Sequence, residues 1–490
     1  MTTRSIPAGA PSSSSGSLDA MTAPDRRTKI VATIGPASAR EDVLTRLVEA
    51  GMDGVRLNFS HGTHEDHGES ARRVRAVQAA AGRPLALIAD LQGPKLRVGD
   101  LSAPFDLDVG DAVVVAGEDS AREGDLPVAP DVLGSVLEPN DEVLIDDGHV
   151  RLRVERVEEG RALCRVVTGG VVEPHKGVNV PGVPLPVPSL TPKDLDDLEF
   201  ALALGVDYVA QSFVRERADV AALRAKIEAA GSQAWVIAKI ELKDAVTALD
   251  DILDEADAVM IARGDLGVEI GAAEVPLLQK RIILAALERG KPAITATQML
   301  ETMVHRPEPT RAEASDVANA ILDGTSAVML SAETAVGEYP VEAVETMARI
   351  ARAVEPSLGY RHQLPGAAEE PTVGRAMSNA ACDLAEALAA KAILVPTFTG
   401  RTASAVARLR PRRPVVALTH VVTSLQHMAI EWGVTPLEIP ESNDVDDLWR
   451  HSIEAARAAG IVAAGDRVVL TAGTAVNIPG STNVIKVDVA

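Results

Sequence analysis

The sequence predicts an α/β fold, in which a (β/α)8 TIM barrel carries an inserted small β-barrel domain and precedes a C-terminal α/β domain. Three observations lead to this prediction. From residue 29 onward, short apolar runs alternate with amphipathic helical stretches, as in folds that bury parallel strands behind helices. One stretch of period-two alternation with Gly and Asp turns interrupts this pattern. A further series of strand and helix patterns fills the last part of the chain.

Eight apolar runs are the expected barrel strands, and helical patterns separate them. The predicted strands are residues 29–34, 54–59, 85–90, 207–213, 235–241, 258–262, 292–297 and 327–330, and the clearest helices are 42–50, 65–80, 220–230 and 277–289. Polar residues cluster directly after the strands, which is where barrels of this kind place their active sites.

The third strand–helix unit is interrupted by the predicted β domain, residues 94–190, so the barrel itself is assigned to residues 25–93 and 191–357. Its strands are expected at 109–116, 142–145, 150–157 and 161–168, with a turn at Asp146-Asp147-Gly148. The helical pattern resumes after Thr191, a good N-cap, with Pro192 in the first turn. A domain inserted above a barrel mouth is a candidate lid.

The two ends of the chain differ in composition. Residues 1–24 are rich in Ser, Ala, Gly and Pro and predict a disordered tail, and they lack the apolar core of a secretory signal. A linker is expected at 360–370, within a C-terminal regulatory domain assigned to 358–490. Its strands are predicted at 392–396, 415–419, 435–439, 467–472 and 483–489.

Composition excludes several classes of function. A net charge of −22 argues against binding to nucleic acid, which requires a basic surface. Cys164 and Cys382 are the only cysteines and lie far apart, so neither a disulfide framework nor a cysteine metal site is indicated and a cytoplasmic location is expected. The sequence contains no apolar run of the ~20 residues that span a bilayer, and no membrane partner is expected.

Two motifs at neighbouring strand ends carry the predicted chemistry. Lys239 and Glu241 close one strand, and Asp265 follows the next. Because side chains alternate along a strand, Lys239 and Glu241 point the same way. An ammonium beside two carboxylates suits a divalent metal next to a fixed positive charge, which is a site for phosphate or enolate oxygens. The alternative is a structural cluster of ion pairs at a barrel rim.

Seven motifs, in this order along the chain, resemble those of the pyruvate kinase family. They are 29–38 (KIVATIGPAS), 55–62 (VRLNFSHG), 239–241 (KIE), 261–267 (IARGDLG), 296–301 (ATQMLE), 309–313 (PTRAE) and 329–335 (MLSAETA). The resemblance covers nearly everything after the tail. It implies phosphoryl transfer from phosphoenolpyruvate to ADP, giving pyruvate and ATP, with Mg²⁺ or Mn²⁺ as cofactor.

The resemblance also implies roles for individual residues. Glu241 and Asp265 would hold the divalent ion, and Lys239 would lie beside the migrating phosphoryl group. The substrate would be bound by Arg56, Thr297 and the backbone amides at Gly264 and Asp265, since amides that open a helix suit a carboxylate. Ser331 is similar to a residue that relays a proton to the enolate, with water as the alternative. The positions implied for the nucleotide are Asn58, His61, Arg97 and the lid lysine Lys176.

One motif departs from the pattern of many family members, which carry Asp-Thr-Lys-Gly-Pro-Glu and bind K⁺ there. This chain keeps Asn58, Ser60 and Asp90 but has Leu91 for Thr and Lys95 for Glu. It resembles the branch in which a lysine ammonium replaces the monovalent ion, so we expect activity without K⁺.

The C-terminal domain resembles the family's regulatory domain. An effector phosphate site is expected at Thr397, Thr399, Gly400, Arg401 and Thr402, which follow a strand and open a helix. A plain capped helix is the alternative. The loop 472–481 departs from the fructose-bisphosphate-responsive pattern, which leaves a sugar phosphate or AMP as effector.

The family implies a homotetramer. Two competing functions are a barrel aldolase or lyase acting on pyruvate enolate, which would leave the inserted domain without a task, and an inactive effector-binding protein, which the retained Lys239, Glu241 and Asp265 oppose.

Overall fold

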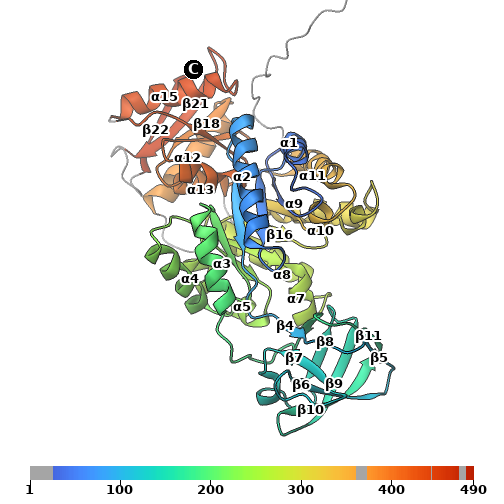
Figure 1. The fold of residues 1–490 in the computed structure, drawn as a ribbon. Coiled ribbons are helices and arrows are strands. Elements are labelled where there is room, and N and C mark those ends of the chain that lie inside the picture. The colour runs from blue at the N-terminus through green and yellow to red at the C-terminus, as the bar shows by residue number, and fades with distance from the viewer. Residues whose placement is uncertain (1–25, 360–371, 443, 474–481) are drawn as a thin grey trace, which may run out of the picture.

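The computed structural model describes residues 26–359, 372–442, 444–473 and 482–490. Three bodies follow one another along the long axis of the molecule, with the C-terminal domain at one end, the barrel in the middle and the small β domain at the other end (Figure 1). The predicted tail, residues 1–24, and the predicted linker, 360–370, lie outside the described residues.

Eight parallel strands close the central barrel in the order β1-β17-β16-β15-β14-β13-β3-β2. They are β1 (Lys29–Thr33), β2 (Gly54–Asn58), β3 (Ala86–Asp90), β13 (Tyr208–Gln211), β14 (Trp235–Ile240), β15 (Ala258–Ala262), β16 (Ala293–Ala296) and β17 (Ala327–Leu330). Each lies within or at the edge of a predicted apolar run, and most of their residues are buried, as expected for strands covered on both faces. The predicted fold class is confirmed.

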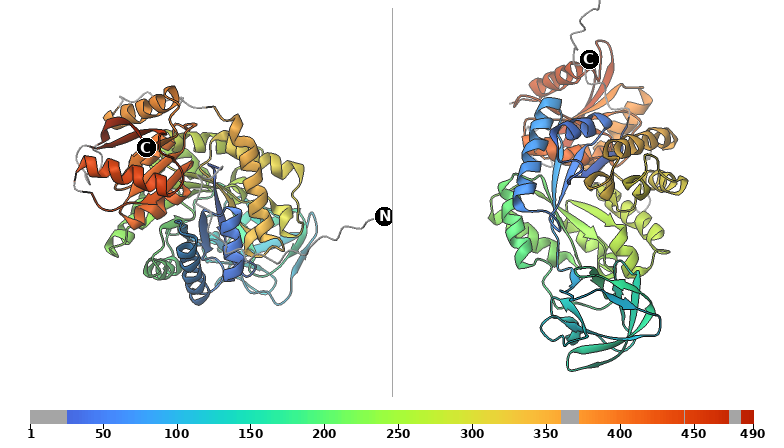
Figure 2. Two further views of the ribbon diagram at one scale, coloured as in Figure 1. Left: turned by 90° about the horizontal axis from the view of Figure 1, so that it is seen from above. Right: turned by 45° about the vertical axis from the view of Figure 1, so that its right-hand side comes forward.

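Helices surround the barrel strands (Figure 2). They are α1 (Glu41–Ala50), α2 (His64–Ala81), α3 (Pro192–Ala203), α4 (Arg217–Ala229), α5 (Lys243–Thr247), α6 (Leu249–Glu255), α7 (Arg263–Ile270), α8 (Val275–Glu288), α9 (Arg311–Asp323), α10 (Ala332–Ala335) and α11 (Pro340–Val354). The cap predicted for α3 is confirmed, because the Thr191 side chain accepts a hydrogen bond from the backbone N–H of Asp194 and Pro192 occupies the first turn. Helix α4 begins three residues before its predicted start, because its cap at Glu216 precedes the apolar pattern.

The inserted segment forms a second closed barrel with the strand order β10-β6-β7-β4-β12-β8-β9, beside a two-stranded sheet of β11 and β5. The strands are β4 (Leu96–Val98), β5 (Phe105–Leu107), β6 (Ala112–Gly117), β7 (Leu126–Ala129), β8 (Glu142–Ile145), β9 (Val150–Glu158), β10 (Arg161–Thr168), β11 (Gly170–Val172) and β12 (Gly177–Asn179). The predicted start of β6 at Val109 is wrong. Gly110 has φ 93° and turns the chain, so Val109 is exposed and the strand begins at Ala112.

The C-terminal domain is a five-stranded sheet in the order β20-β19-β18-β21-β22, of which only the edge strand β22 is antiparallel. Its elements are α12 (Val373–Ala387), β18 (Ala392–Pro396), α13 (Arg401–Ala407), β19 (Val415–Thr419), α14 (Val422–His427), β20 (Val434–Glu438), α15 (Val445–Ala458), β21 (Arg467–Gly473) and β22 (Thr482–Val489). Two separate apolar clusters pack against the two faces of this sheet.

The amino end of the barrel is closed by the C-terminal domain. Ala429 and Ile430 belong to the same apolar cluster as the residues that fill the barrel interior. The Tyr208 hydroxyl at the start of β13 donates to the carbonyl of His427 at 2.6 Å. Because the C-terminal domain covers the amino end, a ligand would reach the barrel from its carboxyl end, which faces the small β domain (Figure 1).

Candidate active site at the carboxyl end of the barrel

Lys239 is the central cation of a charged cluster at the carboxyl ends of the strands. Its ammonium lies 3.3 Å from Asp90 Oδ1 and 3.4 Å from Glu241 Oε2, and it donates to Ser212 Oγ at 2.5 Å. Burial would lower the pKa of Lys239, but the carboxylates of Asp90 and Glu241 outweigh burial, so its pKa is raised. The ammonium is therefore held charged in a largely buried position.

Arg56 is the second cation of the cluster. On strand β2, its Nε lies 2.6 Å from Asp90 Oδ2 and its Nη1 donates to Thr33 Oγ1 at 3.1 Å. Burial would raise the pKa of Asp90, but the charges of Lys239 and Arg56 lower it below its usual value. Asp90 is thus a fixed carboxylate that orients both cations.

Glu241 and Asp265 are the carboxylates that suit a divalent ion. Glu241 is 1 % exposed, and its Oε1 accepts from the backbone N–H of Phe213 at 2.6 Å. Its Oε2 has no hydrogen-bond partner among the described residues. Burial, opposed by Lys239 and reinforced by Asp265, raises the pKa of Glu241 to about 7. A buried carboxylate oxygen that forms no hydrogen bond among the described residues and has the Lys239 ammonium at 3.4 Å, beside a second carboxylate, fits a hard oxygen-ligated cation such as Mg²⁺.

Asp265 lies in the first turn of α7 and is partly exposed, with Lys95 Nζ 3.4 Å from its Oδ1. Thr297 contacts the same turn, because its Oγ1 accepts from the Gly264 N–H at 2.9 Å. Thr297 has φ 68° and Gln298 has φ 53°, unusual values for residues with side chains that are typical of functional sites. The structure thus brings Gly264, Asp265 and Thr297 together at one strand-to-helix turn.

Ser331 follows β17 and presents an uncommitted hydroxyl. Its backbone N–H donates to Glu333 Oε2 at 2.7 Å, and Glu333 also accepts from the N–H of Leu300 at 3.0 Å. The Ser331 Oγ is buried and has no hydrogen-bond partner in the described part of the chain. Buried hydroxyls are almost always hydrogen-bonded, so this one is available to a ligand or a water.

The predicted nucleotide residues fall into two groups. Near the barrel, Asn58 Oδ1 accepts from the Ser60 N–H at 3.2 Å, and the pKa of His61 is lowered by burial and then by the charges of Arg97 and Arg56. In the small β domain, Arg97 donates to the carbonyl of His175 at 3.2 Å.

Lys176 follows His175 in the small β domain and is paired with lid carboxylates. Its ammonium lies 3.2 Å from Asp146 and 3.5 Å from Glu173. No contact between Lys176 and the barrel cluster is found among the described residues.

The residues predicted around the monovalent-cation position also lie in this region. Leu91 is buried, and its carbonyl accepts from Ser212 Oγ at 2.7 Å.

Ser212 and the N–H of Phe213 were missed by the sequence analysis. Residues 207–213 were assigned as a plain strand, yet β13 ends at Gln211 and Phe213 has φ 56°. The polar Gln211-Ser212 pair after an apolar run was the available indication.

The predicted effector residues run from the loop before α13 into the first turn of that helix. Thr397 Oγ1 accepts from the Gly400 N–H at 3.0 Å, Gly400 has φ 85°, and Thr402 hydrogen-bonds to Thr482 at 2.9 Å. Thr399 lies in the same loop, and Arg401 lines a cavity behind the helix. Most of the loop 472–481 lies outside the described residues.

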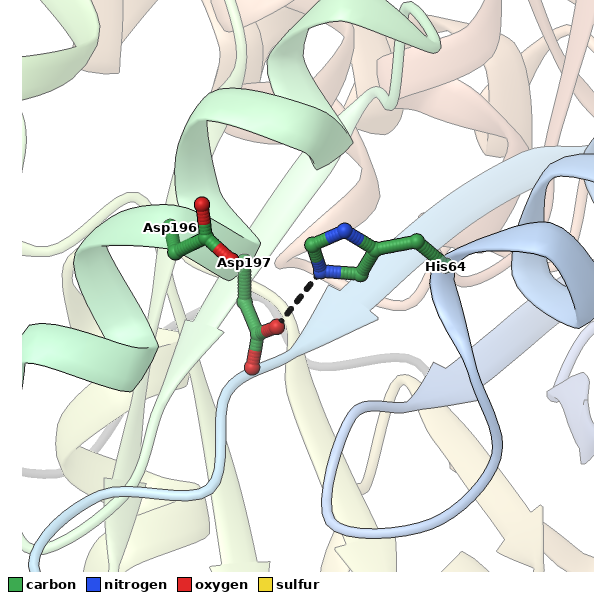
Figure 3. A group of neighbouring side chains, drawn as sticks. All are labelled: His64, Asp196 and Asp197. Carbon is green, nitrogen blue, oxygen red and sulfur yellow. Dashed lines mark hydrogen bonds and ion pairs between the residues drawn. The ribbon is translucent and has the colours of Figure 1, made fainter.

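A histidine and two aspartates on α2 and α3 form the one group of at least three His, Cys, Asp or Glu side chains within metal-binding reach in the described part of the chain (Figure 3). The His64 Nε2 lies 2.8 Å from Asp197 Oδ1, and Lys193 Nζ lies 2.5 Å from Asp197 Oδ2. The His64 ring also stacks on Phe200 at 4.2 Å. An ammonium already neutralises Asp197, so this group is a structural ion-pair network.

Two comparisons with known proteins agree with this geometry. Residues 25–344 match the family described as pyruvate kinase, barrel domain, and residues 375–488 match pyruvate kinase, alpha/beta domain. The chain is 44% identical over 471 residues to a pyruvate kinase of Geobacillus stearothermophilus, covering 95% of this chain and 80% of that protein. It is 44% identical over 466 residues to a pyruvate kinase of Corynebacterium glutamicum, covering 94% and 97% of the two chains. No helix among the described residues has the length and hydropathy that a bilayer crossing requires.

Proposed function

Because the chain belongs to the pyruvate kinase family and transfers a phosphoryl group from phosphoenolpyruvate to ADP, we propose which of its side chains perform each part of that reaction. The observation that carries the assignment is the buried Lys239 ammonium between Asp90 and Glu241. Phosphoryl transfer depends mainly on positioning and on fixed charges around the migrating group. A buried cation at the open end of the barrel supplies such a charge.

Lys239 and Arg56 are the two cations of the proposed reaction centre. Arg56 grips the phosphoryl group of phosphoenolpyruvate through its planar guanidinium, and Asp90 fixes its orientation at 2.6 Å. Lys239 lies beside the bridging oxygen and stabilises the enolate charge that develops as the phosphoryl group leaves. Its contacts with Asp90 and Ser212 hold the ammonium in place before substrate binds.

Members of this family require a divalent ion, generally Mg²⁺, and Glu241 and Asp265 are the proposed ligands, for Mg²⁺ or Mn²⁺. When bound, the ion neutralises charge on the substrate carboxylate and enol oxygen. The amides of Gly264 and Asp265 open a helix toward the same carboxylate, and Thr297 borders it. The Lys95 ammonium lies 3.4 Å from Asp265 Oδ1, so a metal ion held by Asp265 would displace Lys95 from that carboxylate.

The enolate must gain a proton at carbon to become pyruvate, and Ser331 is the proposed route. Its buried Oγ has no hydrogen-bond partner among the described residues, so it can pass a proton from a water to the enolate.

The nucleotide is assigned to Asn58, His61 and Arg97, with Lys176 reaching its phosphates when the small β domain closes. Closure would exchange the lid carboxylates around Lys176 for phosphate oxygens.

The proposed monovalent site is Asn58, Ser60, Asp90 and Leu91, with Lys95 supplying the positive charge that K⁺ supplies in other members. A unit charge at ~4 Å contributes about 4 kcal/mol at an effective dielectric of ~20. This corresponds to roughly 10³ in rate if it is fully expressed in the transition state. An ammonium and a bound ion are therefore interchangeable in size of effect, and one of them is sufficient.

The wild type should accordingly be active in K⁺-free buffer, and Lys95→Glu should lose activity there and regain part of it with K⁺. Rescue should be incomplete, since Leu91 offers only a carbonyl, which Ser212 already contacts. Lys95→Met separates loss of the charge from addition of a carboxylate. Turnover should be titrated with KCl against tetramethylammonium chloride at constant ionic strength. A wild type that is inactive until K⁺ is added would contradict the assignment.

An effector phosphate is assigned to the segment that comprises Thr397, Thr399, Gly400, Arg401 and Thr402. The protein is further proposed to be a homotetramer and to act in the cytoplasm. Thr402→Glu places a negative charge where a dianion would bind, so activation by a sugar phosphate or AMP should be abolished while basal turnover is kept. Activation curves for both proteins, measured across a panel of sugar phosphates and AMP, test this. Equal activation of the variant would place the site elsewhere.

A further inference from the structure

The side chains that we assign to the nucleotide lie on two separate bodies. Asn58 and His61 belong to the barrel loop that follows β2, whereas Arg97 and Lys176 belong to the small β domain. Two connections join these bodies, one between β3 and β4 and the other between β12 and α3. Binding one nucleotide with all four side chains requires a defined orientation of the small β domain on the barrel, and the contacts at the two connections set that orientation.

Asp194, in the first turn of α3, is hydrogen-bonded to both connections and is fully buried. Its Oδ2 accepts from the backbone N–H of Thr191 at 2.8 Å and from the Thr191 hydroxyl at 2.6 Å. Its Oδ1 accepts from the backbone N–H of Gly93 at 2.9 Å. Gly93 lies between β3 and β4, and Thr191 lies between β12 and α3. One buried carboxylate thus fastens the segment that leaves the barrel to the segment that returns to it.

Capping of α3 alone does not account for this arrangement. Helix α2 also begins with a capping box of a threonine and an aspartate, Thr63 and Asp66. The Asp66 carboxylate is exposed, and among the described residues it accepts hydrogen bonds only from Thr63. The burial of Asp194 and its bond to Gly93 exceed what a capping box requires, which indicates a second task for this carboxylate.

Lys193, in the same turn, reaches the loop 58–62, which carries the barrel part of the proposed nucleotide site. Its ammonium donates to the carbonyl of Phe59 at 2.9 Å and to Asp197 Oδ2 at 2.5 Å. The other oxygen of Asp197 lies 2.8 Å from His64 Nε2 (Figure 3). The first turn of α3 therefore contacts both connections of the small β domain and the nucleotide loop.

We propose, on the basis of the nucleotide assignment above, that the first turn of α3 is the joint that sets the small β domain against the loop 58–62. Asp194 and Lys193 are its positioning residues, and neither touches the nucleotide. A carboxylate suits the joint because both of its oxygens accept, and donors of two segments converge on it. An amide has one oxygen, so Asp194→Asn would turn an N–H group toward a backbone N–H and release one connection.

Asp194→Asn should raise KM for ADP about tenfold or more, the usual effect of losing a hydrogen bond to a charged group. KM for phosphoenolpyruvate should change far less, because Arg56, Lys239 and the metal ligands lie on the barrel. Glu313→Gln is the matched control. Glu313 belongs to the capping box of α9 and also accepts from a second segment, at the N–H of Thr302 at 2.7 Å. It joins two parts of the barrel, so KM for ADP should be unchanged in this variant.

Hydrogen exchange of the full-length protein, followed by mass spectrometry, reports on the joint itself. Residues 91–96 and 180–191 should exchange faster in Asp194→Asn than in the wild type or in Glu313→Gln, because an amide that loses its acceptor opens more readily.

The half-exposed Lys193 supplies a second pair of variants if Asp194→Asn does not fold. Lys193→Met should raise KM for ADP about threefold or more. Lys193→Arg keeps a donor for the carbonyl of Phe59 and should restore the wild-type value.

A double-variant cycle separates this proposal from the nucleotide assignment on which it rests. Lys176→Met removes the ammonium that the joint would place, so in that background Asp194→Asn should raise KM for ADP by a smaller factor than it does alone. An unchanged KM for ADP in Lys176→Met would contradict the nucleotide assignment.

Three results would overturn the joint while leaving that assignment intact. They are an unchanged KM for ADP in folded Asp194→Asn or Lys193→Met, an equal rise in KM for both substrates, and full additivity with a Lys176→Met variant that itself raises KM for ADP. Faster exchange at the two connections without a change in KM for ADP would also overturn it, because Asp194 would then be a structural contact only.

Discussion

The two ends of the same eight-stranded barrel are built for different tasks. At the carboxyl end, the Lys239 ammonium lies 3.3 Å from the carboxylate of Asp90 and 3.4 Å from that of Glu241. At the amino end, Ile430 of the C-terminal domain fills the barrel mouth, and Lys29 donates to the carbonyl of Val434 at 2.8 Å. Both ends bury a lysine, but of the two only the Lys239 ammonium forms ion pairs with carboxylates among the described residues. Asp53 and Glu355 also act on Lys29, and Arg26 and Arg83 oppose them.

The pKa values of the two lysines record this difference. Burial lowers the pKa of Lys29 to about 8, whereas the carboxylates around Lys239 more than compensate for burial and raise its pKa. Lys29 donates to a neutral carbonyl at a domain contact, whereas Lys239 lies between two carboxylates. The comparison teaches that burial alone does not decide whether a lysine stays charged, because the charges around its ammonium set the direction of the pKa shift.

The largest expected effect is that of Lys239→Met, which keeps the aliphatic chain and removes the ammonium. Turnover should fall by on the order of 10²–10³ or more, as for other preorganised charges in active sites, while KM for phosphoenolpyruvate changes less because Arg56 and the metal ligands remain. Lys29→Met is the matched control and should keep turnover while losing about 1–3 kcal/mol of stability. Near-normal turnover in Lys239→Met would contradict the claim that the lysine at the carboxyl end, unlike Lys29 at the amino end, takes part in the reaction.

A smaller effect is expected from Ile430→Ala at the closed end. Removing a fully buried isoleucine should lower the free energy of unfolding by about 2–5 kcal/mol. The turnover of the folded fraction should be unchanged, since the substitution is remote from the charged cluster. Urea unfolding and steady-state kinetics on the same preparations measure both quantities. A loss of turnover without a loss of stability would show that the amino end takes part in chemistry.

The smallest expected effect is a pH dependence at Glu241. Its pKa of about 7 in the folded protein lies above the ordinary 4.5, so its contribution to stability without metal is present below about pH 4.5 and lost as the pH rises through about 7. Metal binding requires the ionised form, and Mn²⁺ affinity should therefore increase as the pH rises from 6 to 8.

The Mn²⁺ dissociation constant, measured by electron paramagnetic resonance at both pH values, checks this prediction, with Glu241→Gln as the control that should show weak and pH-independent binding. An affinity that does not change with pH would mean that Glu241 is already ionised at pH 6.

The fold was largely predictable because the barrel strands are apolar runs that local composition alone identifies. The alternation of side chains along a strand predicted that Lys239 and Glu241 point the same way. The distance of 3.4 Å between the Lys239 ammonium and Glu241 Oε2 agrees with that prediction. The short strands β4, β5, β7, β11 and β12 of the small domain were not predicted, because three or four residues carry too little periodicity. Ser212 and Phe213 escaped notice for another reason. Their roles depend on a positive φ at Phe213, which packing around the site imposes and local sequence does not.

A residue whose partner changes when a domain moves shows different contacts in different conformations. Lys176 is the example in this molecule. A lysine that reaches a nucleotide only when a domain closes is identified by motif, while in the structure it pairs with Asp146 and Glu173.

The central claim is that the carboxyl end transfers a phosphoryl group from phosphoenolpyruvate to ADP with a divalent ion. The most direct measurement is the formation of pyruvate and ATP from phosphoenolpyruvate, with ADP and Mg²⁺ each present or withheld. The account predicts equal amounts of both products, formed only when ADP and Mg²⁺ are both present and lost in Lys239→Met. Pyruvate that forms without ADP, at a rate that the Lys239→Met substitution leaves unchanged, would contradict it.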